Sequence, residues 1–332
     1  MAQQFQEGPI VSRLLNKRNA ATCFAGLALI TLAACGGQSA GQDSGSGNGL
    51  SGNISIDGSS TVAPLSTVAA ELFQEKNSGV KVTVGTSGTG GGFEKFCRGE
   101  TDISNASRPI EDDEAKACGD NGVKYDAFEV ANDALTVVVS KDNDWAKCLT
   151  VAQLKKVWEP GSKVKNWNEI DPKFPNEPLK LFGAGTDSGT FDYFTDAING
   201  EEGASRTDYS ATEDDNVTVQ GVSGSKGGLG YFGFSYFEEN SSKLNAVAID
   251  SGKGCVDPSV ESVQDSTYTP LGRPLFIYPS AKSLGTPEGL AFVKYYVEKN
   301  AQIATESKFI PLNPTQETEL QAKFKTLSEL AK

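Results

Sequence analysis

The order of strand, loop and helix is clearest in residues 54–73, ISIDGSSTVAPLSTVAAELF. Ile54 and Ile56 alternate with polar residues, as in a short strand, and residues 57–61 form a polar loop. Apolar residues then recur at helical spacing, and Pro64 stands in the first turn, where its missing N–H costs nothing. This stretch therefore predicts a strand, a tight loop and a helix in immediate succession.

The same succession occurs twice more along the chain. Residues 80–84 (VKVTV) and 179–182 (LKLF) each predict a strand, and a Gly-rich loop follows each of them, at residues 85–92 and 183–190. A helical pattern comes after both loops, with Phe93 as the expected first residue of the earlier helix. Such alternation of strands and helices predicts an α/β fold with largely parallel sheets.

Two apolar runs far apart in the sequence predict strands that connect two lobes. They are residues 135–140 (LTVVVS) and residues 275–278 (LFIY). We expect the chain to enter a second lobe through the first run and to return through the second. Lobe 1 would then comprise residues 52–134 and 275–332, and lobe 2 residues 135–274. A chain of 332 residues with 38% hydrophobic content is large enough for two such cores.

The first 34 residues have the features of a bacterial export signal. Basic residues precede the apolar run AATCFAGLALITLAA at residues 20–34, which is shorter than the ~20 residues of a membrane-spanning helix. The run ends in LAAC, which resembles a lipobox with Cys35 as the lipidated residue. We predict a signal peptide over residues 1–34, a flexible Gly/Ser tether over residues 35–51, and export to the periplasm or cell envelope with a lipid anchor in a membrane. A plain signal peptide with a chance cysteine is the alternative.

Four cysteines follow the leader and Cys35, namely Cys97, Cys118, Cys148 and Cys255. An even number of cysteines in an exported chain predicts two disulfides, for which three pairings exist. We favour Cys97–Cys118 with Cys148–Cys255, because this pairing places one bridge inside each expected lobe. A metal site is disfavoured, because the sequence has neither a C-x-x-C motif nor a histidine.

The composition restricts the possible functions further. The absence of histidine excludes Ser–His–Asp triads and the usual zinc ligand sets, so the commonest enzyme designs are removed although an enzyme is not excluded. Our prediction is a binding protein that is not an enzyme and has no cofactor. The formal net charge of −13 makes nucleic acid an unfavourable partner. A small anion can still bind, because backbone N–H groups act locally while distant surface charges are screened by salt.

Small polar residues gather in the three expected loops that precede helices. A helix N-terminus offers unpaired N–H groups, glycine lets a ligand approach the backbone, and hydroxyls add rotatable donors. The candidate donors are Ser60, Thr61, Ser87, Gly88, Thr89, Ser188, Gly189 and Thr190. Taken singly, each loop could be only an N-cap or a turn. Together they predict a cage of neutral donors for a tetrahedral oxyanion. A nucleotide-binding P-loop is disfavoured, because glycines stand where its Lys-Ser/Thr pair is required.

Four motifs resemble those of the substrate-binding protein of the bacterial phosphate ABC importer: residues 57–62 (DGSSTV), 85–90 (GTSGTG), 102–109 (DISNASRP) and 185–190 (GTDSGT). The similarity extends from about residue 52 to the C-terminus, with the motifs in the same order. It implies a two-lobe type II periplasmic binding protein fold with a hinge of two crossing strands. It also implies a monomer that closes over inorganic phosphate and delivers it to a permease with a cytoplasmic ATPase.

The resemblance also assigns the phosphate ligands position by position. Thr61 and Val62 match the pair of the first loop, which supplies a hydroxyl and a backbone N–H. Ser87, or its neighbour Thr86 because this loop is longer here, matches the serine of the second loop. The Ser-Gly-Thr of the second lobe corresponds to residues 188–190.

Two positions depart from a well-known branch of that family. Arg108 stands where the branch has an aspartate, and Ala184 stands where it has an arginine. We therefore expect Arg108 to face the anion, with a surface or interlobe ion pair as the alternative. In the branch that has this aspartate, its carboxylate accepts a hydrogen bond from the proton of hydrogen phosphate, a proton that fully ionised sulfate lacks. Asp187 is our candidate for the proton acceptor in this chain, and Asp57 is the second candidate. Alternatively, Asp187 could cap a helix N-terminus or pair with Arg108.

Three other functions remain open on the sequence. The chain could bind another tetrahedral oxyanion, such as sulfate or molybdate. A phosphate-ester hydrolase would use Ser87 or Ser188 as its nucleophile, although no base or metal set accompanies them. A surface adhesin that retains the fold would bind no anion at all.

Overall fold

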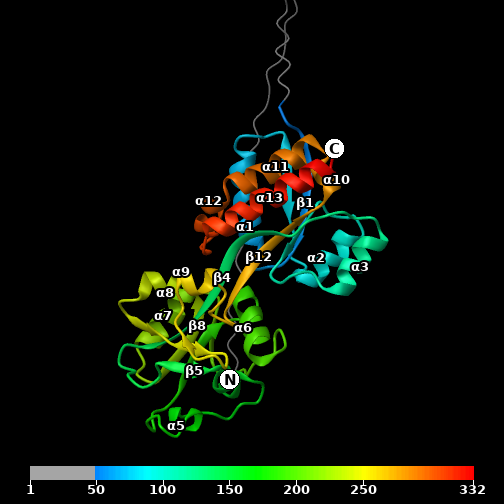
Figure 1. Ribbon diagram of the computed structural model, residues 1–332. Coiled ribbons are helices and arrows are strands. Elements are labelled where there is room, and N and C mark those ends of the chain that lie inside the picture. Colours follow the sequence, from blue (N-terminus) through cyan, green and yellow to red (C-terminus); the bar gives the residue numbers. More distant parts are fainter. Residues whose placement is uncertain (1–48) are drawn as a thin grey trace, which may run out of the picture. The chain divides into compact units, whose positions relative to one another are not determined.

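The computed structural model describes residues 49–332 (Figure 1). The predicted signal peptide, Cys35 and most of the predicted tether lie outside the described residues. Within residues 49–332, no helix has both the length and the apolar character needed to cross a membrane.

Two long strands, β4 (Phe128–Ser140) and β12 (Gly272–Pro279), lie in the middle of the main sheet. They pair with each other antiparallel, and Figure 1 shows them passing from the blue and orange part of the chain to the green and yellow part. In residues 49–332 this sheet has nine strands in the order β2-β1-β3-β12-β4-β8-β6-β7, with β9 paired to β4 beside this path. The prediction of two crossing strands is confirmed.

The other elements fall on either side of β4 and β12, and we use lobe 1 for residues 52–134 and 275–332 and lobe 2 for residues 135–274. Those of lobe 1 are β1 (Gly52–Gly58), α1 (Ala63–Gln74), β2 (Val80–Val84), α2 (Gly88–Cys97), β3 (Ile103–Ala106), α3 (Asp112–Asp120), α10 (Ala281–Leu284), α11 (Pro287–Glu298), α12 (Asn300–Glu306) and α13 (Pro314–Leu330). Those of lobe 2 are β5 (Cys148–Thr150), α4 (Val151–Trp158), α5 (Trp167–Ile170), β6 (Lys180–Ala184), α6 (Gly189–Asn199), β7 (Ser210–Thr212), α7 (Asp215–Ser223), β8 (Gly228–Gly233), α8 (Phe234–Asn240), β9 (Leu244–Ala246), β10 (Ala248–Asp250), β11 (Cys255–Val256) and α9 (Val260–Gln264).

Buried apolar side chains form separate clusters in the two lobes. One large cluster draws its fully buried members from residues 54–131 and 275–327. The other draws them from residues 134–271, apart from Ile310. Each lobe therefore has a core of its own, and the paired strands β4 and β12 connect the two lobes.

The sheet is mixed, which corrects the expectation of largely parallel sheets. The pairs β1–β2, β1–β3, β6–β7 and β6–β8 are parallel, as strand–loop–helix units require. The two long strands are antiparallel to their neighbours β3 and β8. They are also antiparallel to each other, because one carries the chain into lobe 2 and the other carries it back.

Helix α2 begins earlier than predicted, at Gly88 rather than at Phe93. The glycines expected to form a loop are instead its first turns. A Cβ added at Gly92 would lie 2.5 Å from the Cα of Gly58, so only glycine lets α2 pack this closely on the end of β1. The close approach explains why a helix is built from residues with poor helix propensity.

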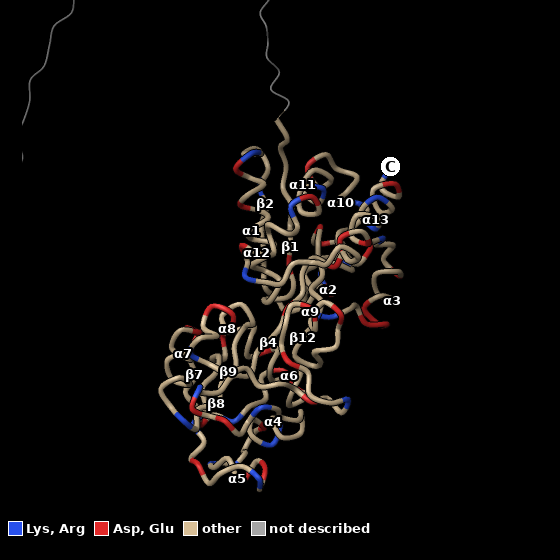
Figure 2. The backbone as a smooth tube through the Cα atoms, turned by 60° about the vertical axis from the view of Figure 1, so that its left-hand side comes forward, with Lys and Arg blue, Asp and Glu red and all other residues tan. Residues whose placement is uncertain are grey.

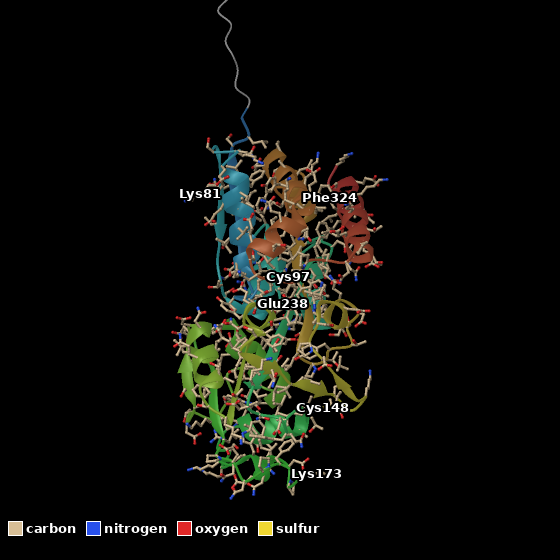
Figure 3. The ribbon with its side chains drawn as sticks, turned by 90° about the vertical axis from the view of Figure 1, so that its left-hand side faces the viewer. Lys81, Cys97, Cys148, Lys173, Glu238 and Phe324 are labelled. Atoms are coloured by element: carbon tan, nitrogen blue, oxygen red, sulfur yellow. A yellow bond between two sulfur atoms is a disulfide. The ribbon has the colours of Figure 1, made fainter. Side chains whose placement is uncertain are left out.

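The described chain contains both predicted disulfides. Cys97 is bonded to Cys118, and Cys148 to Cys255. Figure 3 shows Cys97 in the lobe that carries Lys81 and Cys148 in the lobe that carries Lys173. The predicted pairing is confirmed.

Candidate anion-binding site

The loop between β1 and α1 gives its helix no side-chain cap, but the Ala63 N–H donates to the Ser59 carbonyl oxygen at 3.1 Å and Pro64 has no N–H. The N-cap position is Val62, whose side chain is buried in the lobe 1 core and provides no capping hydrogen bond. The preceding residues Ser60 and Thr61 line two cavities. The backbone donors that this loop can present to a ligand are therefore the N–H groups of residues 60–62, together with two hydroxyls.

The loop before α2 is held in place by Asp57. The Ser87 hydroxyl and the Ser87 backbone N–H both donate to Asp57 Oδ1, at 2.8 and 2.9 Å. The same carboxylate accepts from the Gly58 N–H at 2.7 Å and from Lys95. Burial alone raises the pKa of Asp57, but the hydrogen bonds from Lys95, Ser87 and Gly58 outweigh it and lower the pKa below its ordinary value. Ser87 forms no cap of its own, so the N–H groups at the start of α2 also remain open.

Helix α6 brings the third N-terminus from lobe 2 against lobe 1. Ser188 caps it, and its hydroxyl oxygen accepts a hydrogen bond from the Thr190 N–H at 3.2 Å. A Cβ added at Gly189 would lie 3.0 Å from Thr61 Oγ1. The starts of α1 and α6 are thus in contact across the cleft.

The predicted donors surround two adjoining cavities rather than one. The larger, of about 620 Å³, is lined by Ser60 and Thr61 together with residues 87–89. The smaller, of about 210 Å³, is lined by Ser60 and Thr61 together with residues 188–190. The first loop therefore belongs to both groups, and it is the point at which all three N-termini are connected.

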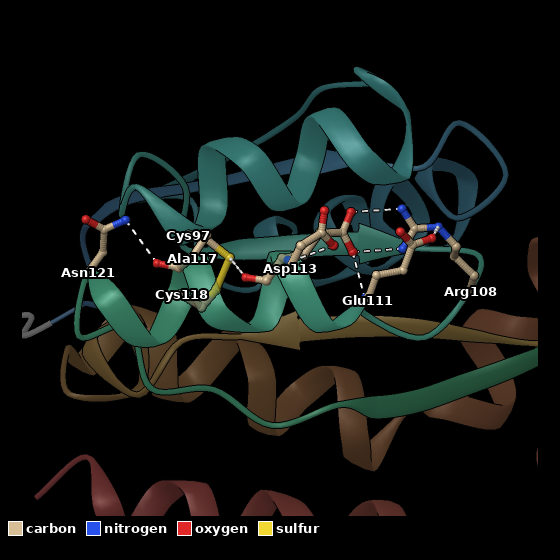
Figure 4. Close-up of a disulfide and its surroundings, with 8 residues drawn as sticks. Cys97, Arg108, Glu111, Asp113, Ala117, Cys118 and Asn121 are labelled. Carbon is tan, nitrogen blue, oxygen red and sulfur yellow. Dashed lines mark hydrogen bonds and ion pairs between the residues drawn. A yellow bond between two sulfur atoms is a disulfide. The ribbon is translucent and has the colours of Figure 1, made fainter.

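Arg108 lines the larger cavity, but its guanidinium is already paired with acids at the start of α3. Its Nη1 and Nη2 donate to the two carboxylate oxygens of Glu114, at 2.8 Å each, and its Nε lies 3.3 Å from Glu111 (Figure 4). The hydrogen bond to Glu114 raises the pKa of Arg108. The structure thus shows the surface ion pair that was the alternative to a ligand contact, and no arginine replaces it at Ala184.

A second arginine, which the sequence did not single out, lies on the crossing strand β12. Arg273 is the register partner of Asp133 on β4, and its Nε lies 3.3 Å from the Asp133 carboxylate. Its Nη2 donates to Thr61 Oγ1 at 3.2 Å, and its guanidinium carbon lies 3.4 Å from the ring centroid of Tyr193 on α6. With a side chain only 17% exposed, Arg273 contacts both lobes and also lines the larger cavity.

Asp133 and Tyr193 are ionisable groups that face Arg273. Burial raises the pKa of Asp133, and the Arg273 charge opposes that rise. Burial also raises the pKa of Tyr193, whose hydroxyl donates to the Pro270 carbonyl oxygen at 2.9 Å. The tyrosine is therefore neutral at physiological pH, and its ring serves as a flat support for the guanidinium.

Asp187 does not lie where the proton acceptor was expected. Its side chain is exposed and lines neither cavity, and its backbone N–H points to Glu213 at 3.4 Å. Other carboxylates line the larger cavity instead, among them Asp192 and Glu202. Burial, helped by the nearby Glu202, raises the pKa of Asp192.

Acidic and basic residues are interspersed along the described chain (Figure 2). The candidate donors that line the two cavities are mainly neutral hydroxyls and backbone N–H groups. Among residues 49–332, no group of three or more acidic, cysteine or histidine side chains is placed to hold a metal ion.

Comparison with known proteins places the chain in a family. Residues 39–300 match the PBP superfamily domain. The chain is 46% identical over 276 residues to protein SphX of Synechococcus elongatus, covering 82% of this chain and 81% of that protein. It is 42% identical over 300 residues to the phosphate-binding protein PstS of Staphylococcus saprophyticus, covering 90% of this chain and 91% of that protein. The chain belongs to the PstS and SphX family of the PBP superfamily.

The solved structures extend this family relationship to the fold. A crystal structure described as a possible phosphate-binding protein from Planctomyces limnophilus superposes with a TM-score of 0.81 at 49% identity, covering 84% of this chain and 99% of that chain. The predicted two-lobe type II periplasmic binding protein fold is confirmed. Among the arginines of residues 49–332 in this member of the PstS and SphX family, Arg273 on β12 is the one that hydrogen-bonds to a predicted ligand residue, Thr61.

Proposed function

We propose that this chain binds inorganic phosphate outside the cytoplasm by closing its two lobes over the anion, and that it delivers the phosphate to an ABC-type permease. The observation that carries the proposal is that three helix N-termini line the two cavities bordered by Ser60 and Thr61, with hydroxyls from each and unbonded backbone N–H groups at the starts of α1 and α2. Membership of a family with phosphate-binding proteins supports the choice of anion.

The proposed ligand set combines neutral donors from both lobes. Lobe 1 contributes Ser60, Thr61, the Val62 N–H and residues 87–89, and lobe 2 contributes residues 188–190. Arg273 is the proposed cationic neighbour, because it reaches Thr61 from the hinge. Arg108 is proposed to fix α3 to the cavity rim. Asp187 is not part of the proposed set, because it lines neither cavity.

Lobe closure would allow neutral hydroxyl and N–H donors, each of which contributes a weak hydrogen bond, to bind phosphate tightly together. Only contacts that are made in the closed form favour that form, and the α6 N-terminus supplies such contacts from lobe 2. Closure also removes water, so each donor–anion hydrogen bond strengthens in the lower dielectric. The two crossing strands are suited to act as the hinge, since they carry the only sheet pairing between lobes in residues 49–332.

The cell-envelope location is a further part of the proposal. A signal peptide over residues 1–34 and lipidation at Cys35 would hold the phosphate site near the membrane, on the tether of residues 35–51. The lipobox-like LAAC sequence supports this anchor. Mass spectrometry of the membrane-extracted protein should find a diacylglyceryl group on Cys35, and Cys35→Ala should release the protein from the membrane. An unmodified N-terminus would contradict the anchor.

Isothermal titration with phosphate and with sulfate tests the proposed ligand. Phosphate should bind at one site per chain, with sulfate much weaker at the same pH and ionic strength. Thr61→Val, which removes only a hydroxyl, should weaken phosphate binding about 10- to 100-fold, the effect of losing one hydrogen bond to a charged group. Thr318→Val is the matched control, because the Thr318 hydroxyl bonds only within α13. Absence of phosphate binding, or equal binding of sulfate, would contradict the proposal.

A further inference from the structure

Two hydroxyls at the cleft accept a hydrogen bond within the protein and have a hydrogen available for a ligand. Thr61 Oγ1 accepts from Arg273 Nη2 and Ser188 Oγ accepts from the Thr190 N–H, each at 3.2 Å. Guanidinium and amide N–H groups can only donate, so the direction of these bonds is certain. Each of these two hydroxyls uses one lone pair inside the protein and can donate its hydrogen to the cleft, whereas the Thr89 hydroxyl is shared with the Ser107 hydroxyl at 3.1 Å.

Ser87 has the opposite polarity. Its hydroxyl lies 2.8 Å from Asp57 Oδ1, and three N–H donors, from Gly58, Ser87 and Lys95, already converge on the same carboxylate. A carboxylate so surrounded is ionised and can only accept, so the Ser87 hydroxyl must donate to it. Toward the larger cavity, which Ser87 lines, this oxygen presents lone pairs alone.

Phosphate has one feature that matches such an acceptor. At neutral pH it carries at least one P–OH group, whereas sulfate and monofluorophosphate are tetrahedral dianions without a proton. Lone pairs on Ser87 would accept a hydrogen bond from P–OH but would repel an unprotonated oxygen or a fluorine. A site built around one hydrogen bond rejects an analogue that cannot form it far more strongly than shape alone allows.

We infer that Ser87, held as an acceptor by Asp57, receives the proton-bearing oxygen of phosphate and so selects phosphate over unprotonated oxyanions. The inference rests on the proposed function. It gives Ser87 the task that the sequence assigned to Asp187, and it makes Asp57 a positioning residue that acts through Ser87. Asp57 itself is not the direct acceptor, because it lines neither cavity and its carboxylate already accepts from the four donors named above.

The test compares Ser87→Ala with Ser188→Ala in titrations with phosphate, sulfate and monofluorophosphate. Ser87→Ala should weaken phosphate binding about 10- to 100-fold while sulfate and monofluorophosphate change by less than about threefold, so the selectivity collapses. Ser188→Ala removes a donor and should weaken all three anions by a similar factor. Ser87→Thr keeps the hydroxyl and should retain the selectivity.

The outcomes separate this inference from the proposed function. If the unmodified protein binds no phosphate, the proposed function fails. If it binds phosphate but Ser87→Ala weakens all three anions equally, only the inference fails, and a cavity carboxylate such as Asp192 or Glu202 becomes the acceptor. Loss of folding is not expected to obscure the result, because Ser87 is exposed and does not cap α2. Thermal unfolding of each variant verifies this.

Discussion

The contact between Gly189 and Thr61 gives a direct test of lobe closure. In Gly189→Ala, the new Cβ would lie 3.0 Å from Thr61 Oγ1 and 3.4 Å from both Ser60 Oγ and the Thr61 nitrogen. Overpacking of this kind costs about 1–3 kcal/mol. Because the overlap exists only when the lobes meet, the cost falls on the closed form. Phosphate affinity should therefore fall about 5- to 150-fold.

The stability of the open protein should not fall with the affinity. Gly189 has no positive φ, and alanine is a better helix former than glycine by up to about 1 kcal/mol. Isothermal titration gives the affinity, and urea unfolding without phosphate gives the stability. Gly119→Ala in α3 is the matched control, since a Cβ there meets nothing within 4 Å. Unchanged phosphate affinity in Gly189→Ala would refute the contact between α1 and α6 in the bound state.

Three further predictions concern charges and cross-links. Arg273→Gln should weaken phosphate binding at least about tenfold, because it removes the hydrogen bond to Thr61 and the positive charge. It should also lower the free energy of unfolding by roughly 3–5 kcal/mol, because the buried Asp133 carboxylate loses its partner. Arg108→Gln should weaken phosphate binding less than Arg273→Gln does. Equal losses of phosphate affinity in the two variants would contradict the proposal that Arg273 is the cationic neighbour of the anion and that Arg108 only fixes α3. Burial, with Asp214 and Glu213 nearby, raises the pKa of Asp215 to about 6, so its contribution to stability is full below about pH 4 and is lost as the pH rises through 6. Asp215→Asn should therefore stabilise the protein by about 1–2 kcal/mol at pH 7.5, after allowance for solvent screening, and by nothing near pH 4; a gain that is constant between these pH values would show that the charge is not its cause. Replacing Cys148 and Cys255 together by serine opens a 107-residue loop and should lower the free energy of unfolding in urea by about 2–5 kcal/mol, and an unchanged unfolding midpoint would contradict the bridge.

Local patterns in the sequence predicted the elements that hold the donors. The alternation around Ile54 and the helical spacing after Pro64 are properties of neighbouring residues, so β1 and α1 follow from them. The predicted start of α2 was wrong by five residues. Its glycines are needed for close packing against Gly58, which is distant in the sequence, so no local pattern reveals them as helical. Helix propensity favours a loop there, and only the packing of α2 on β1 overrides it.

The charged part of the site depends on contacts that no local pattern records. Arg273 is 212 positions from Thr61 in the sequence and stands alone in a Pro- and Gly-containing stretch. It reaches the cleft only because β12 pairs with β4 in a register that puts it opposite Asp133. By contrast, the pairing of Arg108 with acidic residues could have been predicted from the sequence, because Glu111 and Glu114 form a capping box directly after it.

The position of phosphate in a crystal structure of the complex tests the central claim most directly. The account predicts one phosphate beside Ser60 and Thr61, with its oxygens within about 3.2 Å of donors from α1, α2 and α6. It also predicts Arg273 on Thr61 and Arg108 still paired with Glu114. A phosphate bound elsewhere, or held by Arg108 and Asp187 without the three helix N-termini, would contradict it.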